Sequence, residues 1–292
     1  MFAGLYTAII TPFKEDLSVD FEQLSTLMQY QINANVNGVV LLGTTGESPT
    51  LSTSESEIII KKMIALNKGQ INIIVGVGTN CTKTSIERAK KAEASGADAI
   101  MVVNPYYNKP TQKGLITHFT TIADAVSIPV LLYNIPGRTG VNLSMDTLKQ
   151  LSRHPNIQGV KEASGDLQQI KTICTTFKDR EDFSVLSGDD ILTNQVIQFG
   201  GKGVVSVISN ILPKKLKECI DTLLQGKLEE GNRIFKSLLP IMDLCFIETN
   251  PIPIKTLMAR EGLCYEIFRL PLTSMLPENK EKLLSLKAIS QY

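Results

Sequence analysis

The sequence predicts an α/β protein in which residues 1–225 form a (β/α)₈ TIM barrel and residues 226–292 form a C-terminal helical domain. Eight short apolar runs alternate with amphipathic, helix-like segments up to about residue 225. Residues at or just past successive run ends recur at intervals of 26 to 33, one βα unit per step. After Gln225 and Gly226 the strand pattern stops, and only helix-like segments follow.

The predicted strands are short apolar runs, as expected for strands buried on both faces of a parallel sheet. In chain order they are residues 5–11, 38–42, 71–77, 99–103, 129–133, 157–161, 183–186 and 203–207. An open doubly wound sheet would show the same alternation, because periodicity alone does not reveal closure. The count of eight units favours the barrel.

The predicted helices have apolar residues at helical spacing. Between the strands they include residues 21–34, 54–66, 82–94 and 167–177, and in the C-terminal part residues 228–245, 253–260 and 278–289. The sequence contains no low-complexity tract or long linker between these two parts. We therefore expect the C-terminal helices to pack against the barrel.

Composition argues against several classes of function. The 43% hydrophobic and 20% charged residues are typical of a soluble globular protein, and the net charge of +1 favours neither nucleic acid nor an anionic membrane as partner. A signal peptide and a membrane span are not expected from the apolar pattern. The five cysteines are scattered along the sequence, which is typical of a protein whose thiols are reduced. These features predict a cytoplasmic protein that acts on small molecules.

Lys161 is the sharpest candidate for chemistry, because it ends the sixth predicted strand. The active site of such a barrel is built at the carboxyl ends of its strands. Lysine forms imines with carbonyl substrates, but its amine must first lose a proton, and an unperturbed lysine has a pKa of about 10.4. Burial would lower that pKa by a few units. The alternative is a solvated lysine at the start of a loop.

Thr44 and Thr45 lie in the sequence Gly-Thr-Thr-Gly-Glu, residues 43–47, which follows the second predicted strand and precedes a helix. The two glycines permit a tight turn whose amides and hydroxyls could hold a carboxylate or phosphate. The sequence lacks the lysine of a Walker loop. A purely structural strand-to-helix turn fits this pattern equally well.

Tyr133 ends the fifth predicted strand, next to the strand of Lys161, and could exchange protons with an imine-forming lysine. Arg138, five residues later, offers a planar fork for a carboxylate. The alternatives are an interior aromatic residue and a turn arginine. Tyr107 follows the fourth strand and is more ambiguous, because such aromatic residues often pack a subunit interface.

The seventh predicted strand is followed by Ser-Gly-Asp-Asp, residues 187–190. A metal site is not expected there, because the chain has only two histidines, His118 and His154, in unrelated segments. Turn and helix-cap roles suit the two aspartates better. Gly188 in this motif and Val205 in the eighth strand are further predicted substrate contacts. No cofactor or metal is predicted.

Taken together, five motifs resemble the dihydrodipicolinate (4-hydroxy-tetrahydrodipicolinate) synthase family, a group of lyases in the pyruvate-dependent class I aldolase superfamily. They are residues 43–47, 106–108, 133–140, 161–165 and 187–190, in order and at barrel spacing. The resemblance covers nearly the whole chain. It implies condensation of pyruvate with L-aspartate 4-semialdehyde to give 4-hydroxy-tetrahydrodipicolinate, in diaminopimelate and lysine biosynthesis.

The resemblance also implies roles for individual residues. Lys161 would form a Schiff base with pyruvate, whose carboxylate would bind the Thr44 and Thr45 loop. A proton relay would run through Tyr133, Thr44 and Tyr107, with Tyr107 reaching in from a neighbouring subunit. Arg138 would hold the carboxylate of the semialdehyde. The family also suggests a homotetramer built as a dimer of dimers, although some members are dimers.

Two other functions are alternatives to this one. N-acetylneuraminate lyase, in the same superfamily, usually has serine in place of Thr44 and an apolar residue in place of Arg138, so both residues favour the synthase. A noncatalytic barrel that binds a metabolite or a partner would not need Lys161 and Tyr133 together. Asn80 and Tyr106 match a regulatory lysine pocket of the family, but Ser56 and Thr84 stand where sensitive members often have His and Glu. Weak or absent inhibition by lysine is therefore expected.

Overall fold

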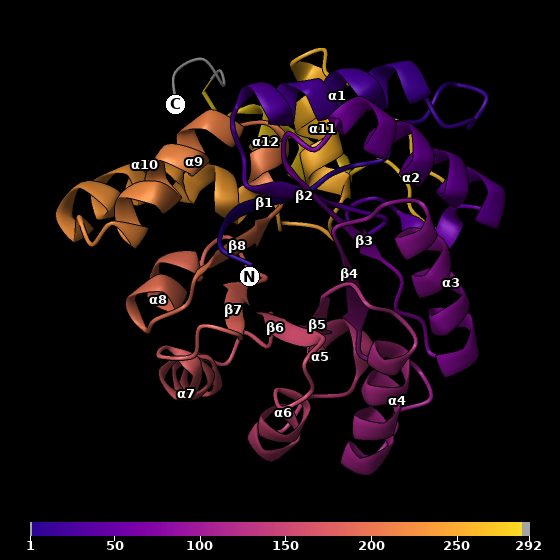
Figure 1. Ribbon diagram of the computed structural model, residues 1–292. Helices are drawn as coiled ribbons and strands as arrows, with labels where there is room; N and C mark the ends of the chain where they lie inside the picture. The colour runs from indigo at the N-terminus through magenta and orange to yellow at the C-terminus, as the bar shows by residue number, and fades with distance from the viewer. Residues whose placement is uncertain (1, 288–292) are drawn as a thin grey trace. The chain divides into compact units, whose positions relative to one another are not determined.

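The computed structural model describes residues 2–287 and contains a closed parallel barrel with strand order β1-β2-β3-β4-β5-β6-β7-β8 (Figure 1). The strands are β1 (Gly4–Ala8), β2 (Gly38–Leu41), β3 (Asn72–Gly76), β4 (Ala99–Val103), β5 (Val130–Asn134), β6 (Ile157–Glu162), β7 (Ser184–Ser187) and β8 (Gly203–Ser206). Each overlaps a strand predicted from the sequence, so the barrel prediction is confirmed. Nearly every strand residue is buried, which explains the unbroken apolar runs.

The chain divides into two compact units. Among the described residues, the first contains Asn72–Val205 together with residues 2–4, and the second contains Leu5–Ile71 and residues 206–287. The predicted boundary at residue 225, between a barrel and a separate helical domain, stays a prediction.

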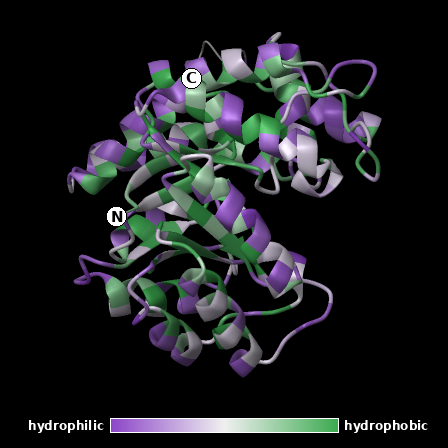
Figure 2. Ribbon diagram, turned by 45° about the vertical axis from the view of Figure 1, so that its right-hand side comes forward, coloured by the Kyte–Doolittle hydropathy of each residue, from purple (hydrophilic) through white to green (hydrophobic). Residues whose placement is uncertain are grey.

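The first unit holds strands β3 to β7 and most of β8. Its helices are α3 (Thr82–Ala94), α4 (Gln112–Asp124), α5 (Pro136–Thr139), α6 (Met145–Leu151), α7 (Leu167–Phe177) and α8 (Thr193–Gln198). In Figure 1, α3, α4, α6, α7 and α8 surround the outside of these strands. Figure 2 shows the hydrophilic residues concentrated on the helices and loops, and the hydrophobic residues concentrated in the strands.

Register within this unit determines which side chains can meet. Strand β5 pairs with β6 in parallel, with Tyr133 opposite Lys161 and Asn134 opposite Glu162. Strand β6 then pairs with β7, with Glu162 opposite Ser187. The carboxyl ends of these three strands therefore lie side by side, and so do the loops that follow them.

The second unit holds β2 and most of β1. Its helices are α1 (Phe21–Asn33), α2 (Thr53–Asn67), α9 (Pro213–Leu224), α10 (Leu228–Leu244), α11 (Ile252–Arg260) and α12 (Pro277–Leu284), with single 3₁₀ turns η1 (Ser48–Thr50) and η2 (Ile208–Asn210). Helices α9 and α10 pack against each other, as do α11 and α12. Helix α2 begins at a capping box, in which Ser52 and Glu55 satisfy each other's backbone N–H groups.

The predicted C-terminal helix at residues 278–289 is too long. Helix α12 ends at Leu284, and residues 288 and 289 of that prediction lie outside the described part of the chain. The Arg260 guanidinium donates to the backbone oxygens of Leu284, Leu286 and Lys287 at 3.1 to 3.4 Å. These bonds occupy carbonyl groups that a further helical turn would have to use.

Candidate active site

Lys161 and Tyr133 form the centre of a buried cluster in the first unit. The Lys161 amine lies 4.1 Å from the centroid of the Tyr133 ring, as their register across β5 and β6 requires. Both side chains are almost inaccessible to solvent, at 6% and 4% exposure. Lys161 is therefore not the solvated loop lysine that the sequence left as an alternative.

Burial changes the acidity of Lys161. Desolvation lowers its pKa from 10.5 to about 7, the charge of Asp190 opposes this shift, and the charge of Arg138 adds to it. At pH 7 about half of the Lys161 amines are then neutral, which is on the order of a thousandfold more than for a free lysine. Within the described residues, Lys161 forms no ion pair with a carboxylate at 4 Å or less. A neutral amine can act as a nucleophile at this pH.

Gly188 lies against this lysine. A Cβ atom at residue 188 would be 2.7 Å from Ala163 Cβ and 3.1 Å from Lys161 Cγ and Cε, all closer than ordinary packing allows. The Gly188 N–H donates to the Glu162 carbonyl at 2.8 Å, which keeps the loop after β7 close to β6. Only glycine fits beside Lys161 at this distance.

The neighbouring Asp189 has the turn role expected from the sequence. Its carboxylate accepts the Ile191 N–H at 3.1 Å, and its backbone oxygen accepts the Ser187 and Thr193 hydroxyls at 2.7 and 2.9 Å. Burial raises the pKa of Asp189. The residues that the structure describes contain no group of three or more His, Cys, Asp or Glu side chains suited to a metal ion.

A buried polar network, which was not predicted from the sequence, supports the strands of the cluster. Asn134 donates to Glu162 at 3.0 Å and to Asn142 at 2.8 Å, and it accepts from Asn104 at 2.9 Å. Gln169 on α7 donates to Glu162 at 3.3 Å. Burial raises the pKa of Glu162. The sequence does show polar residues at the carboxyl ends of apolar strands. It does not show that they bond to one another, because the partners are 28 to 30 residues apart in the chain.

Arg138 belongs to the short helix α5. The Thr139 hydroxyl fixes this turn by sharing its one proton between the backbone oxygens of Ile135 and Val141, at 3.0 and 2.9 Å. The Arg138 side chain is exposed, yet its charge lowers the pKa of buried Lys161. An exposed guanidinium whose charge acts on the amine suits an anionic ligand.

Tyr107 lies outside the cluster. Its side chain is 89% exposed and contacts little of its own chain, and its backbone adopts the left-handed conformation with φ of 73°. A non-glycine residue seldom adopts this conformation. Tyr106 beside it is also exposed. Val205, which was predicted to contact the substrate, is buried in β8.

Thr44 and Thr45 belong to the second unit, in the loop of residues 43–47 that follows β2. This 43–47 loop is a pair of tight turns, closed by the Gly46 N–H to Gly43 and the Glu47 N–H to Thr44, both at 3.1 Å. Thr44 is half-buried, whereas Thr45 is buried and its hydroxyl accepts from Asn250 at 2.9 Å. A 3₁₀ turn, and not an α-helix, follows the loop directly.

The sequence pattern of the dihydrodipicolinate synthetase family matches residues 1–290 of this chain. The chain belongs to the dihydrodipicolinate synthetase family. Among curated members, the 4-hydroxy-tetrahydrodipicolinate synthase of Leptospira biflexa is 49% identical over 278 residues, which cover 94% of this chain and 92% of that protein.

Solved structures of this family have the same fold. The 4-hydroxy-tetrahydrodipicolinate synthase of Methylacidiphilum fumariolicum SolV is 41% identical with a TM-score of 0.94, covering 98% of this chain and 94% of that one. The chloride-inhibited dihydrodipicolinate synthase of Acinetobacter baumannii, solved as a complex with pyruvate, is 39% identical with a TM-score of 0.94 and 97% coverage of both chains. The family resemblance predicted from the five motifs is confirmed.

Other structural features agree with the sequence. Within residues 2–287 the five cysteines form no disulfide bond, and three of them, Cys174, Cys219 and Cys245, are buried. Within residues 2–287, none of the helices combines the length and the apolar character that a membrane crossing requires. The predicted cytoplasmic location and the predicted homotetramer stay predictions.

Proposed function

We propose that Lys161 is the Schiff-base lysine of a 4-hydroxy-tetrahydrodipicolinate synthase, which condenses pyruvate with L-aspartate 4-semialdehyde. The observation that carries this proposal is the buried amine of Lys161, with its pKa of about 7, against the ring of Tyr133. Family membership supplies the reaction. The same reaction belongs to diaminopimelate and lysine biosynthesis.

The neutral amine attacks the ketone carbon of pyruvate, and the carbinolamine then loses water to give an imine. Loss of a proton from the methyl group converts the imine to an enamine. The enamine carbon attacks the aldehyde carbon of the semialdehyde, whose oxygen takes up a proton. Attack by the substrate amine on the imine carbon closes the ring and releases the Lys161 amine.

These steps need proton transfers at the imine nitrogen and at the substrate oxygens. Tyr133 is proposed to exchange these protons, because its ring lies against Lys161. Thr44 and Tyr107 are proposed to continue the relay to solvent. Tyr107 would act across a subunit interface, since its exposed ring is available to a second copy of the chain. A homotetramer built from two dimers would provide that interface.

Substrate binding is assigned to residues around this centre. The amides and hydroxyls of Thr44 and Thr45 are proposed to hold the pyruvate carboxylate. Arg138 is proposed to hold the carboxylate of the semialdehyde through paired N–H bonds. Gly188 gives the substrate access beside Lys161, and Val205 supplies an apolar wall. No cofactor takes part in the proposed reaction.

Turnover with the two competing aldehydes tests the function directly. The purified protein should consume pyruvate in the presence of L-aspartate 4-semialdehyde and should lose this activity in Lys161→Ala. N-acetylmannosamine in place of the semialdehyde tests the N-acetylneuraminate lyase alternative. Turnover with the sugar alone would retain the Schiff base but contradict the role given to Arg138.

A further inference from the structure

A second buried lysine, Lys255, lies in the second unit and is bonded to the last residue of the 43–47 loop. Its ammonium donates to Glu47 Oε1 at 2.6 Å, and both side chains have zero exposure. It also donates to the backbone oxygens of Ile267 at 2.6 Å and Thr11 at 3.2 Å. All three directions in which an ammonium can donate are thus occupied.

The surroundings of this ion pair are apolar. Lys255 Nζ lies 4.5 Å from the ring centroid of Phe13 and 4.9 Å from that of Phe268. Burial lowers the pKa of Lys255, while the charge of Glu47 opposes that shift. Removing two charges from water costs free energy that their attraction often only offsets, so stability alone does not explain such a pair. Its effect on the geometry of the loop gives a better reason.

Glu47 connects the 43–47 loop to the C-terminal part of the chain. Its backbone has φ of 51°, a left-handed conformation that non-glycine residues seldom adopt. On one side of Glu47, the Gly46 backbone oxygen accepts the Thr11 hydroxyl at 2.7 Å. Thr11 therefore holds the loop at Gly46 and, through its backbone oxygen, contacts Lys255 as well. The pair connects Thr44 and Thr45 to α11.

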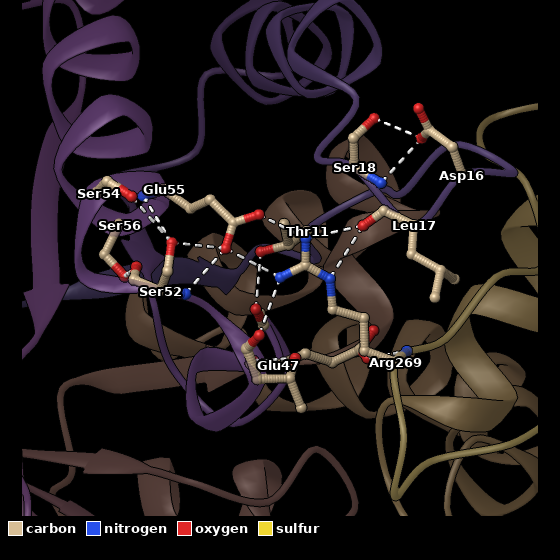
Figure 3. Close-up of polar contacts among 12 residues, drawn as sticks. Thr11, Asp16, Leu17, Ser18, Glu47, Ser52, Ser54, Glu55, Ser56 and Arg269 are labelled. Atoms are coloured by element: carbon tan, nitrogen blue, oxygen red, sulfur yellow. Dashed lines mark hydrogen bonds and ion pairs between the residues drawn. The ribbon is translucent and has the colours of Figure 1, made fainter.

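Arg269 strengthens the same attachment from the other oxygen of the carboxylate. Its backbone N–H lies 3.4 Å from Glu47 Oε2. Figure 3 shows its guanidinium directed at Glu55 and at the backbone oxygen of Leu17, with bonds of 3.0 Å to Glu55 Oε2 and 2.7 Å to Leu17. The guanidinium lowers the pKa of Glu55 to about 2, so this contact remains ionic at neutral pH. Both oxygens of Glu47 are thus held by the C-terminal part of the chain.

We infer that Lys255 is a positioning residue for pyruvate binding, which acts through Glu47 to hold the 43–47 loop in the shape that receives the substrate carboxylate. The inference rests on the proposed function, in which Thr44 and Thr45 bind that carboxylate. Lys255 itself touches no substrate. The ion pair keeps the amides and hydroxyls of the loop aimed in one direction, so that binding does not have to order them.

Three variants separate positioning from stability. Lys255→Met and Glu47→Leu each leave one buried charge without its partner, and both should lower the melting temperature. The double variant, with both residues apolar and of similar volume, should regain most of the lost melting temperature. A matched control, Lys217→Met with Asp221→Leu, removes an ion pair from the surface of α9. It should behave as the wild type does.

The decisive readout is the pyruvate concentration that gives half-maximal trapping by borohydride, measured by mass spectrometry without a second substrate. In the double variant this concentration should rise about tenfold or more, the loss expected when hydrogen bonds to a charged group become misaligned. A double variant that melts like the wild type and is half-saturated at the same pyruvate concentration would overturn the inference. Should the double variant not fold, Glu47→Gln, assayed well below its melting temperature, gives the same comparison.

This experiment distinguishes the two proposals. If pyruvate is not trapped on the wild-type protein at all, the proposed function fails. If the wild type is trapped and half-saturation is unchanged in the variants, the function stands and the positioning role of Lys255 fails.

Discussion

Activity should fall steeply below neutral pH, because the amine of Lys161 must be neutral to attack a ketone. With a pKa of about 7, the neutral fraction is about one half at pH 7, about a tenth at pH 6 and about a hundredth at pH 5. The dependence of kcat/KM on pH reports ionisations of the free enzyme. The logarithm of kcat/KM for pyruvate should therefore rise with unit slope to a pH of about 7 and then level off.

Two substitutions should shift the rising, acidic part of this pH profile, here called the acid limb, in opposite directions. The charge of Asp190 raises the pKa of Lys161, and the charge of Arg138 lowers it. Asp190→Asn should therefore shift the limb to lower pH, and Arg138→Leu should shift it to higher pH. Because Arg138 is also proposed to bind the semialdehyde, the suitable assay is the rate of pyruvate capture by cyanoborohydride, with no second substrate present.

A matched control removes the same charge elsewhere. Asp182 is exposed and paired with Arg180, and its charge is not among the causes of the Lys161 shift. Asp182→Asn should leave the limb where the wild type has it. A wild-type limb above a pH of about 9, near the ordinary lysine pKa, would refute the reasoning, because burial would then not activate Lys161. A limb that ignored both Asp190→Asn and Arg138→Leu would refute the electrostatic part.

Three further results are expected. Lys161→Met should raise the free energy of unfolding by roughly 4 kcal/mol at pH 7. The gain in stability should shrink as the pH rises toward 10.5, the ordinary pKa of lysine, because Lys161 of the unfolded wild type then also loses its proton. Thermal melts of both proteins at pH 7 and at about pH 9 measure this change. An equal gain at the two pH values would contradict the prediction. Gly188→Ala should slow imine trapping about tenfold or more, because its Cβ would press on Lys161; an unchanged trapping rate would rule this out. Lysine should inhibit weakly or not at all, given Ser56 and Thr84; half-inhibition at submillimolar lysine would disprove this.

Local sequence patterns predicted most of the fold. Helix α1, for example, occupies Phe21–Asn33 where residues 21–34 were expected, because its apolar spacing and the Asp20 cap are both local signals. Helix α12 was predicted too long, because the residue that ends it, Arg260, comes from another helix. The end of a helix can depend on such distant contacts, which the apolar periodicity of the sequence does not show.

In the candidate site, too, local patterns predicted some residues, and distant contacts kept others from being predicted. Lys161 and Tyr133 were predicted because each ends an apolar strand, and neighbouring parallel strands bring their ends together. The role of Glu162 was missed, because its partner Asn134 lies 28 residues away. Lys255 was missed for a stronger reason. Its partner Glu47 is 208 residues distant, and a lysine within an apolar helix pattern gives no sign of what it binds.

Two lysines are buried among the described residues, and the proposed function requires that only Lys161 react with pyruvate. Lys255 is bonded to a carboxylate at 2.6 Å, whereas Lys161 has no such partner among the described residues. The most direct test is borohydride reduction in the presence of pyruvate, followed by peptide mapping. The proposed Schiff-base role of Lys161 requires a single adduct, on the peptide that contains Lys161, and none in Lys161→Ala. An adduct on Lys255, or an undiminished adduct in Lys161→Ala, would contradict it.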